Sequence, residues 1–464
     1  MSRGSDPPLT FPLPGVKPVV ADFDGGDLSS DAGFLPLALA DQQLQLTTRL
    51  AGAIADRRDP RKVAFPLALL LQERVYLIAQ GYADALDAQA LRHDPVLQLA
   101  VGRTPADGAL AGQSTLSRLE NAISGSDLAR LGQVLLDVFL ERCQAHAART
   151  GQRPCVILDL DPFVDPAHGA QQGVLFNGHY DTQCYLPLYL CGSLDGGRQY
   201  VLGVLLRDGR AGATHGARFL LTRVIQALRA WAPDLEILVR GDSAFGVPKL
   251  LRRCRQLQVF YCFGKAQNAR LHALSESVQL RAAVVYNVQR RAVPVYGEFE
   301  YAAESWQHPE RVICKTEVTT GAGGVPKLNP RFIVTNLGEE DGWSPAAVHG
   351  CYCERGDPEN RIKEFKRDLE GDRLSCHTWT ANQFRLILHV AAYLLYQVLQ
   401  DALAEVAPAT AWAQAQVGTV RAKLLKVAAR VIERCRVVRV HLPCRCPWAT
   451  LWRQLWVALC PAPS

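Results

Sequence analysis

The sequence lacks any long uninterrupted apolar segment. Its first 15 residues contain no apolar run of the kind that forms the centre of a secretory signal peptide. The most apolar stretch, residues 384–403, is interrupted by four polar or charged side chains, Arg385, His389, Gln397 and Asp401. Because a membrane-spanning helix needs about 20 predominantly apolar residues, we expect neither export nor membrane insertion, and we assign the chain to the cytoplasm.

A strong excess of one charge is also missing. Lysine and arginine together number 51, against 45 for aspartate and glutamate, and the pI is about 8.6. This balance is compatible with a polyanionic partner but does not require one. The chain has 464 residues, of which 48% are hydrophobic and 21% charged, so it can bury a large core and is expected to form two or three domains.

Cysteine motifs with the paired spacing of a zinc site are absent as well. The 14 cysteines are scattered along a chain that is far too large for a disulfide scaffold. Two short clusters, Cys351-x-Cys353 and His441-x-x-Cys444-x-Cys446, have no second half-site at matching spacing. We therefore expect free thiols in a reducing cytoplasm.

The composition changes several times along the chain. A Pro/Gly-rich opening precedes helix formers with the apolar spacing of amphipathic helices, and a later segment alternates β-branched and arginine residues. No internal repeat is evident. We predict an irregular segment at 1–36, a helical domain at 37–150, the first part of an α/β core at 151–265, a β-rich insertion at 266–327, the second part of the core at 328–400, and a basic helical region at 401–464.

Short apolar runs define the predicted core. Residues 154–158 form an apolar run that ends in Asp159-Leu160-Asp161-Pro162, as a buried strand with acids at its tip would. A helix is expected at 217–230. Further core strands are expected at 185–191, 200–206, 235–239, 259–263 and 331–337, and insertion strands at 284–291 and 311–315. Strands followed by alternating helix and strand indicate an α/β (α+β) fold with a mixed sheet and helices packed on it.

Acidic residues follow two of these strands. Asp159 and Asp161 lie two apart, so they face the same side of an extended strand. Asp242 comes shortly after the strand at 235–239, behind Gly241, which permits a tight turn. Both strands would therefore deliver carboxylates to the edge of the sheet.

A third acid opens a helix. Asp357 suits an N-cap and Pro358 the first helical position, which would put Glu359 in the first turn. Glu359 and Lys366 are seven apart and share one face of such a helix. A carboxylate and a cation could thus meet one phosphate.

Carboxylates that converge from separate elements suit hard divalent cations. Mg²⁺ binds through one or two carboxylates together with phosphate oxygens and water. Three acids can hold two such ions roughly 3.5–4 Å apart, an arrangement that serves phosphodiester chemistry. Taken singly, each acid also has a structural interpretation, because Asp161 and Asp242 suit turns and Glu359 is favoured by the helix dipole.

The sequence around Glu359 resembles a known signature. Tyr352, Arg355, Glu359 and Lys366 match the Tyr-x2-Arg-x3-Glu-x6-Lys signature of a large lineage of DDE insertion-sequence transposases. The chain is similar to the branch called DDE domain group 1 over about residues 30–440. The branch's landmarks occur in order: Asp159-Leu-Asp161, His168-Gly169-Ala-Gln171-Gln-Gly173, Asn177-Gly-His179-Tyr180, Leu206-Arg207-Asp-Gly209, Arg240-Gly241-Asp242, Thr335-Asn336-Leu337, Arg355-Gly356-Asp-Pro-Glu359-Asn360 and Asp372-Arg373-Leu-Ser375-Cys376.

The resemblance implies an RNase H-like core interrupted by a β-rich insertion between the second Asp and the Glu. It implies a catalytic and metal-binding triad of Asp161, Asp242 and Glu359, with Asp159 as the alternative first acid, and two Mg²⁺ ions that Mn²⁺ can replace. The residues that it assigns to DNA contact are Tyr352, Arg355, Lys366, Arg240 and Trp306. In the wider lineage an aromatic such as Trp306 can hold a flipped base; the structural alternative, which the residue type favours, is packing in the core.

A basic stretch lies near the C-terminus. Residues 420–441 contain seven cations against one acid, Glu433, so a helix here would carry a positive face that binds DNA phosphates in a salt-dependent way. The structural alternative is a solvated helix with Leu424 and Val431 on its core side. The helical domain at 37–150 is where terminal-repeat recognition would occur, although no helix-turn-helix is convincing there.

The implied function is that of a DNA transposase. It would bind terminal inverted repeats and target DNA, both double-stranded, and catalyse metal-dependent DNA cleavage and strand transfer. We expect a cytoplasmic, nucleoid-associated protein that acts as a dimer or higher oligomer on DNA and has no membrane partner. Two alternatives stay open: a non-catalytic DNA-binding descendant, and a metal-dependent nuclease without strand transfer.

Overall fold

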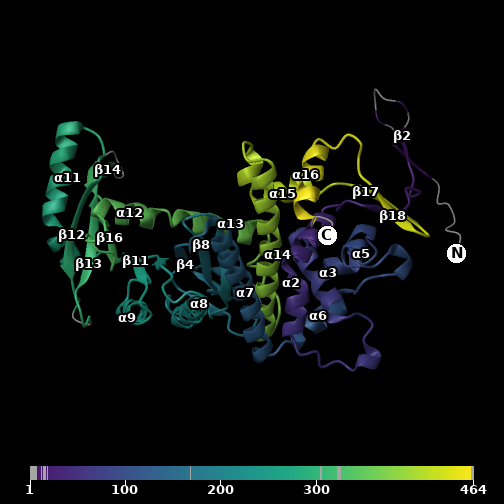
Figure 1. Cartoon of the computed structure of the whole chain (residues 1–464), viewed down its shortest axis with the longest axis horizontal. Coiled ribbons are helices and arrows are strands. Elements are labelled where there is room, and N and C mark those ends of the chain that lie inside the picture. The colour runs from purple at the N-terminus through teal and green to yellow at the C-terminus, as the bar shows by residue number, and fades with distance from the viewer. Residues whose placement is uncertain are drawn as a thin grey trace. The chain divides into compact units, whose positions relative to one another are not determined.

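The chain divides into two compact units, whose elements are labelled in Figure 1. The computed structural model describes residues 8–460 except 12, 14–16, 18, 168, 304–305 and 321–324, and it describes residues 357–360 in their backbone only. Unit 1 comprises Met1–Ala51, Asp56–Leu119 and Leu395–Ser464. Unit 2 comprises Gly52–Ala55 and Glu120–Leu394.

Unit 1 is mostly helical. Its helices are α1 (Phe34–Leu44), α2 (Leu46–Ala53, which ends in unit 2), η1 (Pro60–Lys62), α3 (Leu67–Ala79), α4 (Asp87–Leu91), α5 (Pro95–Ala100), η2 (Pro105–Asp107), α6 (Gln113–Ala122, which also ends in unit 2), η4 (Ala411–Gln414), α15 (Val417–Val420), the π-helical turn η5 (Arg421–Leu425) and α16 (Ala449–Leu459). Its strands are β1 (Leu9–Phe11), β2 (Val19–Ala21), β3 (Leu28–Ser29), β17 (Ala429–Arg434) and β18 (Val437–His441).

The helix α7 (Gly125–Thr150) belongs to unit 2, which differs from the helical domain expected at 37–150. Leu136, Phe139 and Cys143 on one face of α7 are buried in the same hydrophobic cluster as the central strands. This packing joins α7 to the core. Helical periodicity shows that such a face is buried but does not show which element covers it.

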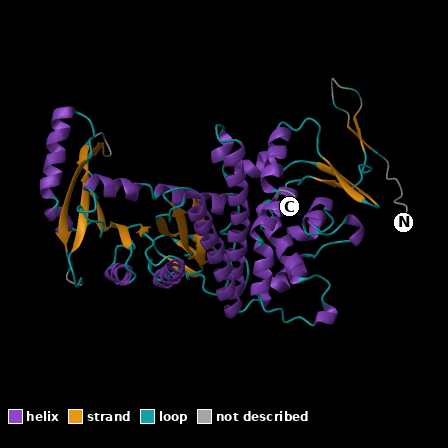
Figure 2. Ribbon diagram, in the orientation of Figure 1, coloured by secondary structure: helices purple, strands orange, loops and turns teal. Residues whose placement is uncertain are grey.

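A mixed sheet forms the centre of unit 2 (Figure 2). Among the described residues it has eight strands in the order β12-β13-β16-β11-β10-β4-β8-β9. These strands are β4 (Val156–Pro162), β8 (Leu188–Leu194), β9 (Gln199–Leu205), β10 (Ile237–Gly241), β11 (Phe260–Lys265), β12 (Val295–Tyr301), β13 (Glu310–Thr316) and β16 (Arg331–Thr335). The predicted core strands and the insertion strand at 311–315 are confirmed within a few residues at each end.

The strand directions define the fold class. β4, β10 and β11 run parallel, whereas β8 is antiparallel to β4 and β9 is antiparallel to β8. The order β9-β8-β4-β10-β11 with these directions is an RNase H-like sheet, as the resemblance implied. On the far side, β16, β13 and β12 extend the sheet with antiparallel pairing.

Helices cover both faces of this sheet. Val156, Leu158 and Leu160 of β4 enter one core cluster together with α7, α8 (Ala217–Trp231) and α9 (Pro248–Gln256). Ile157 faces the other side, in a smaller cluster that includes Val348 of α12 (Pro345–Cys353). A strand with apolar side chains on both faces is stable only when both are covered. Asp159 and Asp161, two and four residues after Ile157, share its face.

The insertion begins with helices, so the strand expected at 284–291 is wrong. Residues 269–289 form α10 (Ala269–Leu274) and α11 (Glu276–Gln289), and α11 contacts β12 and β13. Val278 and Ala282 are buried four residues apart, which is helical spacing. Packing of this face therefore outweighs the strand preference of the β-branched residues. The remaining strands of the insertion, β14 (Val318–Thr320) and β15 (Pro326–Leu328), form a small hairpin.

The helix expected across residues 420–441 is also wrong. After η5 the chain forms the antiparallel hairpin of β17 and β18, and β17 also pairs with β3. Ala429 and Val431 are buried while Arg430 between them is exposed. This alternation has the period of a strand and is incompatible with one continuous helical stripe.

The apolar stretch near residue 390 is a core helix. It lies in α14 (Trp379–Val406), which is long and apolar enough to cross a membrane by length and composition. Within its most apolar window, 94% of the residues are buried against the rest of the protein. The short strands β5 (Asp165–Pro166), β6 (Leu175–Asn177) and β7 (Thr182–Tyr185) form a separate small sheet in unit 2. The helix α13 (Gly356–Arg367) follows α12.

Candidate active site

Two acids lie at the ends of neighbouring parallel strands. Leu160 of β4 lies opposite Gly241 of β10, so Asp161 and Asp242 come next at adjacent strand ends. Neighbouring strands are about 4.8 Å apart. The two carboxylates therefore emerge at one edge of the sheet. Gly241 is required by packing, because a Cβ there would lie 2.8 Å from the ring of Phe245.

The guanidinium of Arg355 lies beside the carboxylate of Asp161. Its Nη2 donates to Oδ1 of Asp161 over 3.2 Å, and only 8% of Arg355 is exposed. Its Nε is buried and has no hydrogen-bond acceptor among the described residues. A guanidinium with an unused N–H can donate to a further anionic oxygen, and phosphate suits its planar geometry.

Tyr352 connects Arg355 with Asp242. Burial raises the pKa of the Tyr352 hydroxyl and the nearby Asp242 carboxylate adds to that rise, whereas Arg355 lowers it. The hydroxyl is accommodated because residue 264 is glycine: a Cβ at Gly264 would lie 2.6 Å from the tyrosine oxygen and 2.9 Å from the Ser243 nitrogen. Tyr352 thus stays a neutral hydrogen-bonding group at neutral pH.

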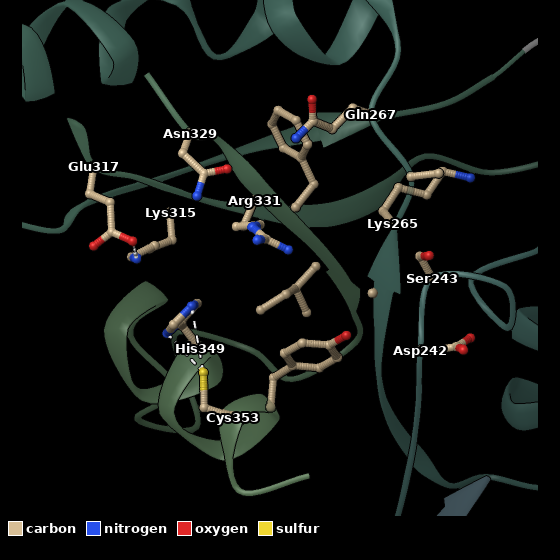
Figure 3. Close-up of a pocket in the computed structure, with 15 residues that line it drawn as sticks. Asp242, Ser243, Lys265, Gln267, Lys315, Glu317, Asn329, Arg331, His349 and Cys353 are labelled. Carbon is tan, nitrogen blue, oxygen red and sulfur yellow. Dashed lines mark hydrogen bonds and ion pairs between the residues drawn. The ribbon is translucent and has the colours of Figure 1, made fainter. Parts of the chain in front are cut away.

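A cavity of about 520 Å³ opens beside Tyr352 and Asp242 (Figure 3). Lys315 of β13 and Arg331 of β16 line it and lie directly opposite each other in the sheet. Like charges in this position are unfavourable, and Glu317 forms an ion pair with Lys315 alone. Arg331 is exposed and forms no described ion pair. The cavity therefore extends from a candidate catalytic acid to an arginine that is free to bind an anion.

Glu359 lies in α13, and its side chain is outside the described residues. The helix begins at Gly356, so the expected N-cap at Asp357 is wrong and Glu359 is the fourth helical residue. Arg355, directly before the helix, has helical backbone angles and makes no capping hydrogen bond. Because Arg355 reaches Asp161, α13 starts beside the end of β4.

Asp159 and Arg240 form a buried ion pair, which bears on the roles expected of both. Arg240 donates from Nε and Nη2 to the two carboxylate oxygens of Asp159, each over 2.8 Å, and Gln199 donates to Asp159 as well. Arg240 is 2% exposed and Asp159 1%. Arg240 is therefore not available to DNA in this structure. The oxygens of Asp159 are already engaged, so it is a poor candidate for the first metal-binding acid.

Lys366 is held by protein groups. Its Nζ donates to the Val164 carbonyl over 2.9 Å and lies 3.6 Å from a carboxylate oxygen of Asp372. Glu370, the acid four residues after Lys366, pairs with Arg373 instead. Asp372 lies beyond the end of α13, so a spacing rule for helices does not find it.

Asp165 is a buried acid beside Lys366. Burial raises its pKa to about 9, the Asp372 carboxylate adds to the rise, and Lys366 opposes it. One carboxyl oxygen of Asp165 has no described hydrogen-bond partner. A protonated, neutral Asp165 at neutral pH follows from this environment.

Trp306 packs against the protein. Its ring lies edge-on to Tyr301, with the ring centroids 5.2 Å apart, and the Lys265 ammonium is 4.8 Å from its centroid. It also contacts the main hydrophobic cluster while remaining partly exposed. These contacts agree with the packing role; base stacking by Trp306 stays a prediction.

An RNase H-like sheet with two carboxylates at neighbouring strand ends and an arginine and tyrosine beside them is the arrangement expected of a DDE transposase domain. Comparison with known families agrees. The family model of the transposase DDE domain group 1 matches residues 11–464, and the chain belongs to this family. A search of the curated proteins finds no match.

Proposed function

We propose that the chain is the transposase of a bacterial insertion sequence, which binds the element's terminal inverted repeats, cuts the DNA there and joins the cut end to target DNA. The register of β4 and β10 carries the proposal, because Asp161 and Asp242 follow paired residues of adjacent parallel strands. Family membership supports a transposase in general. Cleavage and strand transfer by these residues are the finer part of the proposal.

Asp161, Asp242 and Glu359 would hold two Mg²⁺ ions, which Mn²⁺ can replace. The carboxylates of Asp161 and Asp242 suit Mg²⁺, because this ion takes hard oxygen ligands and needs only one or two carboxylates beside phosphate oxygens and water. No cluster of three or more His, Cys, Asp or Glu side chains occurs among the described side chains, which do not include that of Glu359. When bound, the ions would activate the attacking oxygen and stabilise the leaving oxygen.

The protein's cations would position the DNA strand. Arg355 balances the charge of Asp161, and its Nε donor has no described acceptor, so it would donate to a phosphate oxygen once the side chain turns toward the strand. Arg331 offers a second cation, because it lines the same cavity as Asp242. Lys366 is one-quarter exposed and would keep its bond to Val164 while its charge acts on the nearby strand. Phosphate contacts of this kind fix the register of the DNA without reading its sequence.

The proposed chemistry consists of two phosphodiester displacements. In the first, a water oxygen bonds to phosphorus, the 3′ oxygen leaves with a proton, and a free 3′-hydroxyl results. In the second, this hydroxyl attacks a phosphodiester of the target strand and displaces its 3′ oxygen, so one P–O bond breaks for each that forms. No covalent link between protein and DNA is needed.

Cleavage of the DNA that flanks the gene, carried on a plasmid and incubated with Mg²⁺, tests the proposal. Asp161→Asn and Asp242→Asn should abolish cleavage while DNA binding remains, because each removes a metal-binding charge with little change of shape. Asp341→Asn, at an exposed acid before α12, is the matched control and should cut normally. Normal cutting by both test variants would refute the mechanism. Cutting without joined products would identify a nuclease instead.

The proposed setting is the cytoplasm, with the protein associated with the nucleoid through its DNA. We propose a dimer or higher oligomer on DNA, because two transposon ends must be processed together. Size measurements with and without end DNA test this part.

A further inference from the structure

The hairpin of β17 and β18 presents a strongly basic face. The strands pair from Arg430 opposite His441 to Arg434 opposite Val437, and a loop of two residues, Cys435 and Arg436, joins them. β3 pairs with the other edge of β17 at Ala429 and Arg430. The hairpin is thus anchored at one edge.

Alternation sorts the side chains of the hairpin onto two faces. Ala429 and Val431 are buried on the inner face, together with the partly buried Val438 and Val440. The outer face carries Arg430, Arg434, Arg439 and His441, all of which are exposed. The hairpin therefore buries its aliphatic side and presents its cations to solvent.

The one acid of β17 is turned away from this face. Glu433 lies on the inner side, and its Oε2 accepts a hydrogen bond from the Ala106 backbone nitrogen over 3.1 Å. Arg430, Arg434 and Arg439 form no ion pair among the described residues, and neither does Arg436 in the loop. Gathering unpaired guanidinium groups on one small surface is unfavourable unless an anion binds there.

The dimensions fit duplex DNA. Five paired residues span about 17 Å, and the two strands lie about 4.8 Å apart. The major groove is about 12 Å wide and admits a two-stranded β-ribbon. Two aliphatic residues share the outer face with the arginines, Val437, which is 49% exposed, and the partly buried Ile432. Such groups can contact thymine methyl groups while arginines bind phosphates or guanine.

We propose that the β17–β18 hairpin enters the major groove of duplex DNA, with Arg430, Arg434, Arg436 and Arg439 on the phosphates and base edges that flank it. This inference rests on the proposed function for the identity of the partner. It assigns duplex binding to a β-ribbon near the C-terminus, in addition to the helical domain where the sequence predicts recognition. The catalytic acids play no part in it.

The salt dependence of DNA binding by the full chain tests the ribbon. Binding to a 24-base-pair duplex is followed by fluorescence anisotropy in EDTA, which prevents cutting. Arg434→Gln with Arg439→Gln should make the slope of log affinity against log salt shallower by about 1.8, because each lost phosphate contact contributes about 0.9. The matched control is Arg57→Gln with Lys62→Gln, exposed cations of the same unit, which should leave the slope unchanged.

The outcomes separate the ribbon from the proposed function. If the wild type binds and cuts DNA but the salt slope of Arg434→Gln with Arg439→Gln is unchanged, the ribbon proposal is overturned and the proposed function is not. Absence of any DNA binding by the wild type would overturn both. Netropsin, a minor-groove ligand, should not displace the protein, and displacement would refute the major groove. If the double variant loses the wild type's binding to phosphatidylserine vesicles but binds DNA normally, the surface binds a membrane, and the ribbon proposal is overturned.

Discussion

Replacement of Asp159 distinguishes a structural acid from a catalytic one. The Asp159 carboxylate accepts three described hydrogen bonds, two from Arg240 and one from Gln199, and both ions are almost completely buried. Asn has a single acceptor oxygen, so in Asp159→Asn an amide NH2 must face a donor. Breaking a buried ion pair by removal of one partner costs about 3–5 kcal/mol.

Arg240 would keep its bond to the Cys351 carbonyl, so we expect the lower end of this range for Asp159→Asn, about 3 kcal/mol. For a unit of this size, 1 kcal/mol corresponds to about 2–4 °C, and the melting temperature should therefore fall by about 6–12 °C. Asp161→Asn keeps an oxygen for its described bond to Arg355 and should melt within a few degrees of the wild type.

Differential scanning fluorimetry and the plasmid cleavage assay measure the two effects side by side. We expect Asp159→Asn to be destabilised yet to retain measurable cutting at a temperature below its transition. Asp161→Asn should be stable and inactive. A stable but inactive Asp159→Asn, together with an active Asp161→Asn, would show that the first catalytic acid has been assigned to the wrong residue.

Three further predictions concern the pKa of Asp165, the cavity and the glycine beneath Tyr352. The folded protein holds the pKa of Asp165 at about 9, above its usual value, so the neutral form stabilises the fold and stability should fall as pH rises from about 4 to 9. Asp165→Asn should flatten this decline and raise the melting temperature more at pH 8 than at pH 5; an equal effect at both would contradict the raised pKa. Arg331→Gln should make the salt slope of DNA binding shallower by about 0.9, whereas Arg252→Gln, on the helix covering the opposite face, should not. Gly264→Ala should displace Tyr352 and lower cleavage more than binding; normal cleavage would show that this contact is dispensable.

The local sequence pattern predicts a helix or strand correctly where the segment's own composition determines how it is buried. The runs at β4, β10 and β11 are short and mostly apolar, which is typical of interior strands. The predictions for residues 284–291 and 420–441 are wrong because partners elsewhere in the chain decide their form. The helix α11 packs on β12 and β13, while β17 pairs with β3, about 400 residues earlier in the chain.

The same distinction applies to the candidate site. Asp161 and Asp242 could be found from the sequence, since each follows a recognisable strand. The partner of Asp159 could not, because the pairing of Arg240 with it depends on the register of β4 and β10. The opposition of Lys315 and Arg331 likewise depends on how β13 pairs with β16. Long-range register, which no local spacing encodes, decides these contacts.

Location of the bound metal tests the central claim most directly. Crystals of the full chain grown with Mn²⁺ and end DNA would give anomalous peaks at the ions. We predict two peaks about 3.5–4 Å apart, bound by carboxylate oxygens of Asp161, Asp242 and Glu359. Ordered manganese bound elsewhere, with these three carboxylates free of metal, would contradict the account.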